Sequence, residues 1–332
     1  MKKRIISVLA IVLICIMGIS ACKKNVGSPE DNAVLAEDEE GTEETKKYVV
    51  GFSFIDMKNP YFITLESAAR EVLEEAGIEI VLKDPATDPG QQEAQIKEMI
   101  SAGIDAIILS PVDWEQITPA LIELKEAGIR IINVDTQVKE MDYVDAYVGS
   151  DNYSAGYICG EDLIAKCPEG GKIAILECPT QNSVIDRITG FEEAISTAEN
   201  GFEVVAREDT MGEFDRALAA AQRIFSENPD LVAVMCGNDQ NAVGATTAAN
   251  VAEADQVVIY GVDGSPDIKK ELEKSDSKVA GTAAQSPIHI GQDAAEIVIK
   301  ILNNEEYEKE IFEEVFMIDK DNVEMYGVDG WQ

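Results

Sequence analysis

From Tyr48 onward, short and continuously apolar runs alternate with longer segments in which apolar residues recur at helical spacing. The first half contains YVVGFSF, AIILSP and IRIINVD, and the second half repeats the alternation with KIAILEC, LVAVMCG and VVIYGVDG. Runs that are apolar throughout are typical of parallel strands covered by helices on both faces. Gly77, Gly103 and Gly128 precede such runs, so we expect them to end helices in the left-handed conformation.

The periodic segments predict helices over about 61–76, 90–102 and 114–127 in the first array. This array ends near 147–152, where a second array of the same kind begins. A chain of 332 residues also exceeds the usual size of one domain. The pattern therefore predicts an α/β fold with two doubly wound parallel-sheet lobes.

The N-terminus carries the pattern of a targeting segment. Basic residues at positions 2–4 precede an apolar run over 5–17, which is too short to span a bilayer comfortably. The run leads into Ile19-Ser20-Ala21-Cys22, which resembles the lipobox of bacterial lipoprotein signal peptides. We therefore expect a signal peptide over 1–21 and acyl chains on Cys22 that anchor the protein to the membrane. An ordinary secretory signal with a chance cysteine is the alternative.

Charge and composition limit the classes of molecule that the protein can bind. Residues 22–47 are rich in acids and contain no aromatic residue, so they are expected to form a solvated tether. The whole chain has 63 acidic and 27 basic residues and a formal net charge of −36, which excludes nucleic acid as a plausible partner. Hydrophobic residues make up 45% of the chain, enough for real cores. We expect a soluble folded part that remains monomeric.

Cysteine and histidine offer little catalytic chemistry. Cys159, Cys167, Cys178 and Cys236 have no CxxC spacing, so we expect no zinc site and no other cofactor. Cys178 and Cys236 lie in apolar runs and are expected to be buried thiols, while a disulfide involving Cys159 and Cys167 stays open. His289 is the only histidine and has no partner for a hydrolytic triad. It is expected to pack near a hinge.

The residues that directly follow the predicted strands are the candidate site. In open parallel sheets, ligands bind beyond the carboxyl ends of the strands. The residues there are mainly amides, carboxylates and aromatic rings, with one arginine. Carboxylates and amides pair with hydroxyl groups, and rings pack on apolar C–H faces. The set suits a neutral, polyhydroxylated ligand.

The motifs at these positions identify a resemblance that covers nearly all of the chain from Tyr48. NPYF, INVDT, DRITGF, EFDR, GNDQNAVGA, YGVDGSPD and AAQSP occur in the order found in the ribose-type sugar-binding proteins of ABC transporters, which have the type I periplasmic-binding-protein fold. The resemblance implies ten ligand-binding residues: Asn59, Tyr61, Phe62, Asp135, Thr136, Arg187, Phe214, Asn238, Asp263 and Gln285.

One of these positions departs from the family. Ribose binders commonly carry an arginine where this chain has Thr136, so a forked cation is replaced by a single hydroxyl. Ribose is therefore in doubt, and a different or larger sugar becomes an alternative.

The family fold also implies lobes that are not contiguous in sequence. The N-terminal lobe is expected over 48–150 plus 286–315, and the C-terminal lobe over 151–285 plus 316–332, with 316–332 read as a final strand. Hinge strands near 150–152, 284–287 and 315–320 would let the lobes close on a ligand.

The resemblance implies a receptor that binds a pentose or hexose and delivers it to an ABC permease, and not an enzyme. It would lie outside the cytoplasm on the outer face of the cell membrane, or in a periplasm. A sensor that presents a sugar or furanose signal to a signalling partner has the same binding chemistry. A glycosidase using Asp135 and Asp263 is a less favoured alternative. A sugar-responsive repressor would need a DNA-binding module in place of the signal peptide.

Overall fold

The computed structural model describes residues 47–332. The predicted signal peptide, the lipidation site Cys22 and all but the last residue of the predicted tether lie outside the described residues. Within the described part, no helix has both the length and the apolar character needed to cross a bilayer.

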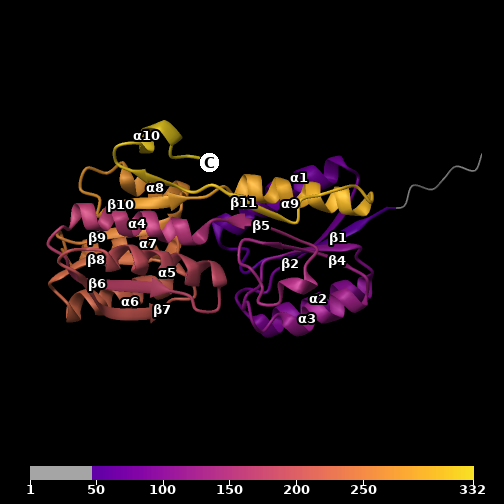
Figure 1. Cartoon of the computed structure of the whole chain (residues 1–332), viewed down its shortest axis with the longest axis horizontal. Helices are drawn as coiled ribbons and strands as arrows, with labels where there is room; N and C mark the ends of the chain where they lie inside the picture. Colours follow the sequence, from indigo (N-terminus) through magenta and orange to yellow (C-terminus); the bar gives the residue numbers. More distant parts are fainter. Residues whose placement is uncertain (1–46) are drawn as a thin grey trace, which may run out of the picture. The chain divides into compact units, whose positions relative to one another are not determined.

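The first lobe is built on a six-stranded parallel sheet with the order β11-β5-β4-β3-β1-β2. One face is covered by two helices that lie side by side, α1 and α9, and the other face by α2 and α3 (Figure 1). The elements are β1 (Val49–Ser53), α1 (Pro60–Glu75), β2 (Glu79–Lys83), α2 (Pro89–Ala102), β3 (Ala106–Leu109), α3 (Thr118–Glu126), β4 (Arg130–Val134), the 3₁₀ turn η1 (Met141–Tyr143), β5 (Ala146–Ser150), α9 (Pro287–Leu302) and β11 (Glu310–Glu313).

The second lobe has a six-stranded sheet with the order β12-β10-β9-β8-β6-β7. All its pairs are parallel except β10 with β12 at one edge. Helices α4 and α5 cover one face, and α6, α7 and α8 cover the other. The elements are α4 (Asn152–Lys166), β6 (Gly171–Glu177), α5 (Asn182–Ser196), β7 (Phe202–Asp209), α6 (Phe214–Glu227), β8 (Leu231–Cys236), α7 (Asp239–Val251), β9 (Val258–Asp263), α8 (Pro266–Leu272), β10 (Val279–Ala284), β12 (Phe316–Asp319) and α10 (Val323–Tyr326).

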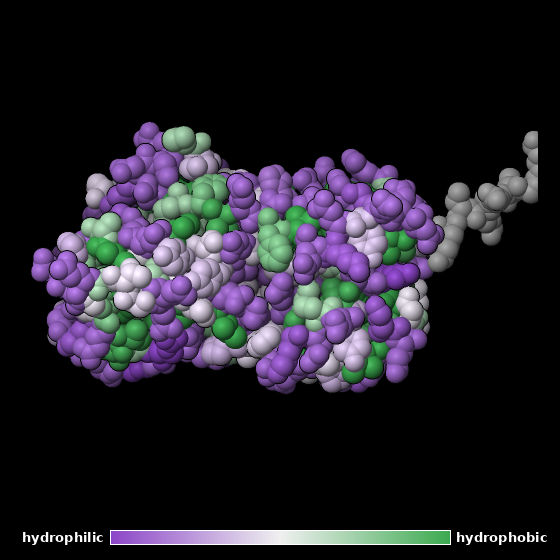
Figure 2. Space-filling model, in the orientation of Figure 1, coloured by the Kyte–Doolittle hydropathy of each residue, from purple (hydrophilic) through white to green (hydrophobic). Residues whose placement is uncertain are grey.

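The predicted fold class is therefore confirmed. The chain passes between the two sheets three times: from β5 to α4, from β10 to α9, and from β11 to β12. Hydrophilic residues dominate the face shown in Figure 2, as the charge excess predicts. Gly77, Gly103 and Gly128 have φ angles of 74°, 80° and 75°, which confirms them as left-handed helix ends.

Two predicted elements are shorter in the structure than expected. The helix expected from 114 begins at Thr118, because the Asp113 carboxylate accepts hydrogen bonds from the backbone N–H groups of Glu115 and Gln116 and holds a turn there. The final strand expected over 316–332 ends at Asp319, whose carboxylate accepts a hydrogen bond from the backbone N–H of Asp321 in a second such turn. Only β12 remains as a strand.

The four cysteines in the described part of the chain are buried or half-buried. Cys159, Cys178 and Cys236 are buried, Cys167 is half-buried, and all four carry free thiols. Burial raises the pKa of the Cys178 thiol to about 11, so this group stays protonated at neutral pH.

Candidate functional site

The strand orders place one point of topological reversal in each sheet. In the first lobe it lies between β1 and β3, and in the second between β6 and β8. Chain directions diverge at such a point, which leaves a crevice beyond the carboxyl ends of the strands.

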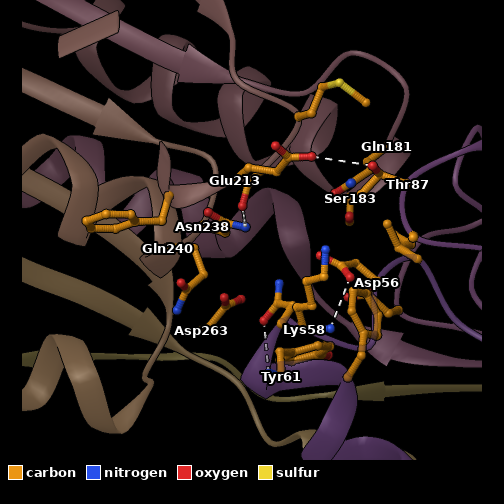
Figure 3. Close-up of a pocket in the computed structure, with 18 of the residues that line it drawn as sticks. Asp56, Lys58, Tyr61, Thr87, Gln181, Ser183, Glu213, Asn238, Gln240 and Asp263 are labelled. Carbon is orange, nitrogen blue, oxygen red and sulfur yellow. Dashed lines mark hydrogen bonds between the residues drawn. The ribbon is translucent and has the colours of Figure 1, made fainter. Parts of the chain in front are cut away.

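A cavity of about 290 Å³ lies beyond these strand ends and is lined by residues of both lobes (Figure 3). This volume is at the low end of the range for small-ligand pockets, about 300–1,000 Å³. Eight of the ten predicted site residues line it: Asn59, Tyr61, Phe62, Asp135, Arg187, Phe214, Asn238 and Asp263.

The first-lobe wall is formed where α1 begins. The Asn59 side chain caps the helix by accepting a hydrogen bond from the Tyr61 N–H at 3.0 Å, and Pro60 occupies the first helical turn. The rings of Tyr61 and Phe62 follow, packed edge to face with centroids 5.3 Å apart. Phe62 in turn stacks on Phe54, with centroids 6.2 Å apart, so the aromatic wall continues into the core.

The polar centre of the cavity has two buried carboxyl groups and one buried guanidinium. Arg187 Nη1 lies 3.7 Å from Asp263 Oδ1, and Arg187 Nη2 lies 4.0 Å from Asp135 Oδ1. Arg187 is fixed from behind by hydrogen bonds from Nε to Asn152 Oδ1 at 2.7 Å and from Nη1 to the Gly237 carbonyl at 2.8 Å. It is therefore oriented toward the cavity without a close ion pair.

Burial governs the titration of both carboxyl groups. Desolvation raises the pKa of Asp263 to about 8, against the opposing effect of Arg187 and with an added contribution from Asp239. Desolvation likewise raises the pKa of Asp135, although Arg187 and a hydrogen bond from Ser110 Oγ partly offset it. The Tyr61 hydroxyl, also buried, makes no hydrogen bond of normal geometry with the described residues, but it lies close enough to Asp135 to lower that carboxyl's pKa.

The backbone at both carboxylates is unusual. Asp135 has a φ of 62° and Asp263 a φ of 136°, in the region that disfavours residues with a Cβ atom. Non-glycine residues in such conformations concentrate at functional sites, where the surrounding structure maintains the strain.

The second-lobe wall comes from the starts of two helices. Asn238 caps α7 by accepting from the Asn241 N–H at 2.9 Å, and its Nδ2 donates to the Gly212 carbonyl at 3.1 Å. Phe214 is the first residue of α6 and lines the cavity. Its ring is half-exposed at the cavity, unlike an ordinary core residue of the helix.

Two predicted residues are not among those that line the cavity. Thr136 is fully buried, and its hydroxyl is hydrogen-bonded to the Ser183 hydroxyl of the other lobe. Gln285 lies behind Asp263 and donates from Nε2 to Asp263 Oδ1 at 2.7 Å. Thr136 therefore joins the two lobes beside the cavity, and Gln285 orients the carboxyl group of Asp263.

The structure also adds polar lining residues that the sequence reading did not select. They are Asp56, Lys58, Thr87, Gln181, Ser183, Glu213, Asp215 and Gln240, most of them labelled in Figure 3. Lys58 directly precedes the recognised NPYF motif, and Gln181 and Ser183 lie in the segment after β6. Their proximity to strand ends was the available signal. Glu213 directly precedes Phe214 in the recognised EFDR motif, whereas Thr87 lies between β2 and α2 and meets Glu213 only where the two lobes touch.

The two lobes touch beside the cavity. The backbone N–H of Trp114 donates to the Thr180 carbonyl at 3.0 Å, and Thr87 Oγ1 donates to Glu213 Oε1 at 3.4 Å. Trp114 itself is absent from the residues that line the cavity, and Lys139 Nζ lies 5.9 Å from the centre of its ring. His289 Nδ1 lies 3.5 Å from Glu313 Oε2, beside the β11-to-β12 crossing.

Comparison with known proteins identifies the family to which this chain belongs. The model for the periplasmic binding protein domain matches residues 50–306. The chain is 27% identical to the ribose import binding protein of Bacillus subtilis, over 80% of this chain and 85% of that protein. It is 30% identical to the ribose import binding protein of Salmonella typhimurium, over 75% and 83%.

A solved structure shares the fold. The periplasmic solute binding protein of an ABC transporter from Actinobacillus succinogenes, with bound D-allose, superposes with a TM-score of 0.76 at 26% identity. The match covers 84% of this chain and all of that one. These relatives are named as binding proteins and not as enzymes, in agreement with the expectation for this chain. The chain belongs to the periplasmic binding protein family and is a relative of the ribose-type sugar-binding proteins of ABC transporters, which work outside the cytoplasm.

Proposed function

We propose that this protein is a lipid-anchored receptor that binds a monosaccharide in the cavity between its lobes and delivers it to an ABC permease. The observation that carries the proposal is the convergence of eight predicted residues from both lobes on a single cavity of about 290 Å³. Relatives named for ribose and D-allose support a pentose or hexose as the ligand class.

The chemistry of the cavity favours a neutral polyol. Asp135, Asp263 and the amides of Asn59 and Asn238 can each pair with a ligand hydroxyl, and Arg187 can donate to a ring or hydroxyl oxygen. Tyr61, Phe62 and Phe214 offer apolar faces on either side. An anionic ligand would have to pair with the single guanidinium of Arg187, which already lies beside the carboxyl groups of Asp135 and Asp263, and this arrangement disfavours it.

Thr136 gives the choice of sugar a physical basis. An arginine at this position would bring a forked donor to the site, whereas Thr136 is bonded to Ser183. A ligand that depends on such a donor for its specificity should bind this protein weakly. We therefore expect the preferred sugar to be other than ribose.

The N-terminal sequence supports attachment to the outer face of the membrane through acyl chains on Cys22. Replacement of Cys22 by Ala should move the protein from the detergent phase to the aqueous phase in phase-separation experiments. An unchanged distribution would contradict lipidation. A sensor would use the same cavity, and transport of the identified sugar in cells lacking this protein separates uptake from sensing.

The binding proposal is tested by thermal unfolding of the full-length chain, stripped of ligand, against pentoses, hexoses, polyols, nucleosides and furanose signals. A ligand present at 100 times its Kd stabilises the fold by about 2.7 kcal/mol, which gives a clear rise in Tm. Asp135→Asn should abolish the rise without unfolding the protein. Absence of any rise across the panel would overturn monosaccharide binding, and turnover of a nitrophenyl glycoside would instead support an enzyme.

A further inference from the structure

The last described residues, Gly330–Gln332, form a segment that we call the C-terminal strap. It follows α10 of the second lobe but does not pack on that lobe alone. Its contacts involve the second lobe, a crossing segment between the lobes, and the aromatic wall of the cavity.

Lys269 of α8 fixes the strap to the second lobe. This side chain is fully buried, and its Nζ donates to the Gly330 carbonyl at 2.5 Å. In the amide orientation that its surroundings favour, the Gln332 side chain accepts from Lys269 Nζ at 2.5 Å and donates to the Gly264 carbonyl at 3.0 Å. A buried ammonium is costly unless acceptors surround it, so these bonds hold the strap and satisfy the lysine together.

A second attachment joins the strap to a crossing between the lobes. The Ser286 hydroxyl, which also caps α9, is hydrogen-bonded to the Gln332 carbonyl. Ser286 lies in the passage from β10 to α9, where the chain leaves the second lobe for the first. The strap is therefore fixed on both sides of Trp331.

Trp331 contacts the first lobe. Its ring packs edge-on against Tyr61, with centroids 5.9 Å apart and planes at 74°, and it joins the apolar cluster formed by α1 and α9. Tyr61 in turn packs edge-on against Phe62. A continuous path of contacts thus runs from Lys269 in the second lobe, through the strap and Trp331, to the ring of Tyr61 at the ligand wall.

We propose that Trp331 is a positioning residue for the ligand site: held by Lys269 and Ser286, it fixes the Tyr61 ring and links that ring to the approach of the lobes. The inference rests on the proposed function, because it requires Tyr61 to contact the ligand. Trp331 does not line the cavity, so its nearest route to the ligand is the Tyr61 ring.

The test uses the sugar identified in the thermal panel and four variants of the full-length chain. Trp331→Ala should raise the Kd for the sugar about three- to tenfold, since an aromatic edge-to-face pair contributes in this range. Trp331→Phe keeps an aromatic ring and should restore most of the affinity. Lys269→Met releases the strap and should weaken binding as Trp331→Ala does. Trp114→Phe, which changes a ring outside the cavity, is the matched control and should bind normally.

Fluorescence gives a readout that a merely structural role would not move. The chain has two tryptophans, so Trp114→Phe leaves Trp331 as the only one. Sugar should shift its emission and reduce quenching by acrylamide, and Lys269→Met should abolish both changes.

Two results separate the possible failures. If the wild-type chain binds no sugar in the panel, the proposed function fails and the role of Trp331 fails with it. If the wild-type chain binds sugar, two results would each overturn only the positioning role. One is an unchanged Kd in Trp331→Ala, and the other is a fluorescence emission of Trp331 that does not change when sugar is added.

Discussion

Sugar binding should depend on pH through Asp263. This carboxyl group is 5% exposed, and burial raises its pKa to about 8 despite Arg187 Nη1 at 3.7 Å. At pH 7 the unliganded protein therefore holds Asp263 mainly in the protonated form. A ligand hydroxyl that donates to this group stabilises the carboxylate, so we expect binding to release a proton.

The size of the effect follows from the ionised fraction. With a pKa of about 8, roughly half of Asp263 is ionised at pH 8, one tenth at pH 7 and one hundredth at pH 6. Affinity should therefore fall about fivefold from pH 8 to pH 7, and about tenfold more from pH 7 to pH 6. Asp135, whose pKa is also raised, acts in the same direction. Burial raises the pKa of Asp239 to about 6, so this group titrates at the lower edge of the window.

Isothermal titration calorimetry checks this reasoning directly. Measurements at pH 6, 7 and 8, each in two buffers of different ionisation enthalpy, give the affinity and the number of protons released. We expect close to one proton at pH 6–7 and less at pH 8. Asp263→Asn should bind about 10- to 100-fold more weakly at pH 8, because a charged hydrogen bond is lost, and should lose most of the pH dependence. An affinity that stays constant from pH 6 to 8, with no proton release, would refute the role assigned to Asp263.

Three further predictions concern the folded scaffold. Because the pKa values of Asp239 and Asp263 are raised in the folded protein, it binds more protons than the unfolded chain from about pH 4 up to those raised values. The Tm of the unliganded protein should therefore fall as the pH rises from 5 to 8, and a rise in Tm would contradict the raised pKa values. Gly156→Ala places a methyl group 1.7 Å from the Arg187 carbonyl oxygen. This change should lower the free energy of unfolding, measured in urea, by about 3 kcal/mol and weaken sugar binding. Gly330→Ala is the control, because its methyl group enters open space and should leave the free energy of unfolding unchanged. Gln92→Leu removes hydrogen bonds to Ser110 and Val112 at the end of β3, and it should cost about 3 kcal/mol in the same assay; a loss below about 1 kcal/mol would show that the buried amide is dispensable.

Much of the fold could be predicted because its signals are local. Continuously apolar runs predicted the parallel strands, and glycines before them marked helix ends. Asp113 shows the limit, because its carboxylate holds a turn inside a segment whose apolar spacing predicted a helix. The antiparallel pairing of β12 with β10 was also beyond a local reading, since it depends on where a late crossing returns the chain.

The candidate site also has a part that could be predicted from local sequence and a part that could not. Residues at strand ends, such as Asp135 and Asp263, were accessible to sequence reasoning because topology brings strand ends together. Thr136 was placed at the ligand, but its partner is Ser183 of the other lobe. Contacts of this kind depend on how closely the lobes approach, and neither residue's neighbours in sequence carry that information.

The centre of the site is arranged so that a ligand can relieve costs that the protein alone retains. Asp135 and Asp263 have positive φ angles, their carboxyl groups are desolvated, and Arg187 stands 3.7–4.0 Å from both without a close ion pair. The desolvation of the two carboxyl groups is unfavourable in a closed cleft without further donors, because Ser110 and Gln285 supply one hydrogen bond each and buried carboxylates need several to remain ionised. A polyol supplies those donors and also bridges the lobes that carry the two groups. Binding energy and lobe closure are therefore coupled through the same atoms: a ligand that satisfies only one carboxylate should bind weakly and leave the cleft less firmly closed.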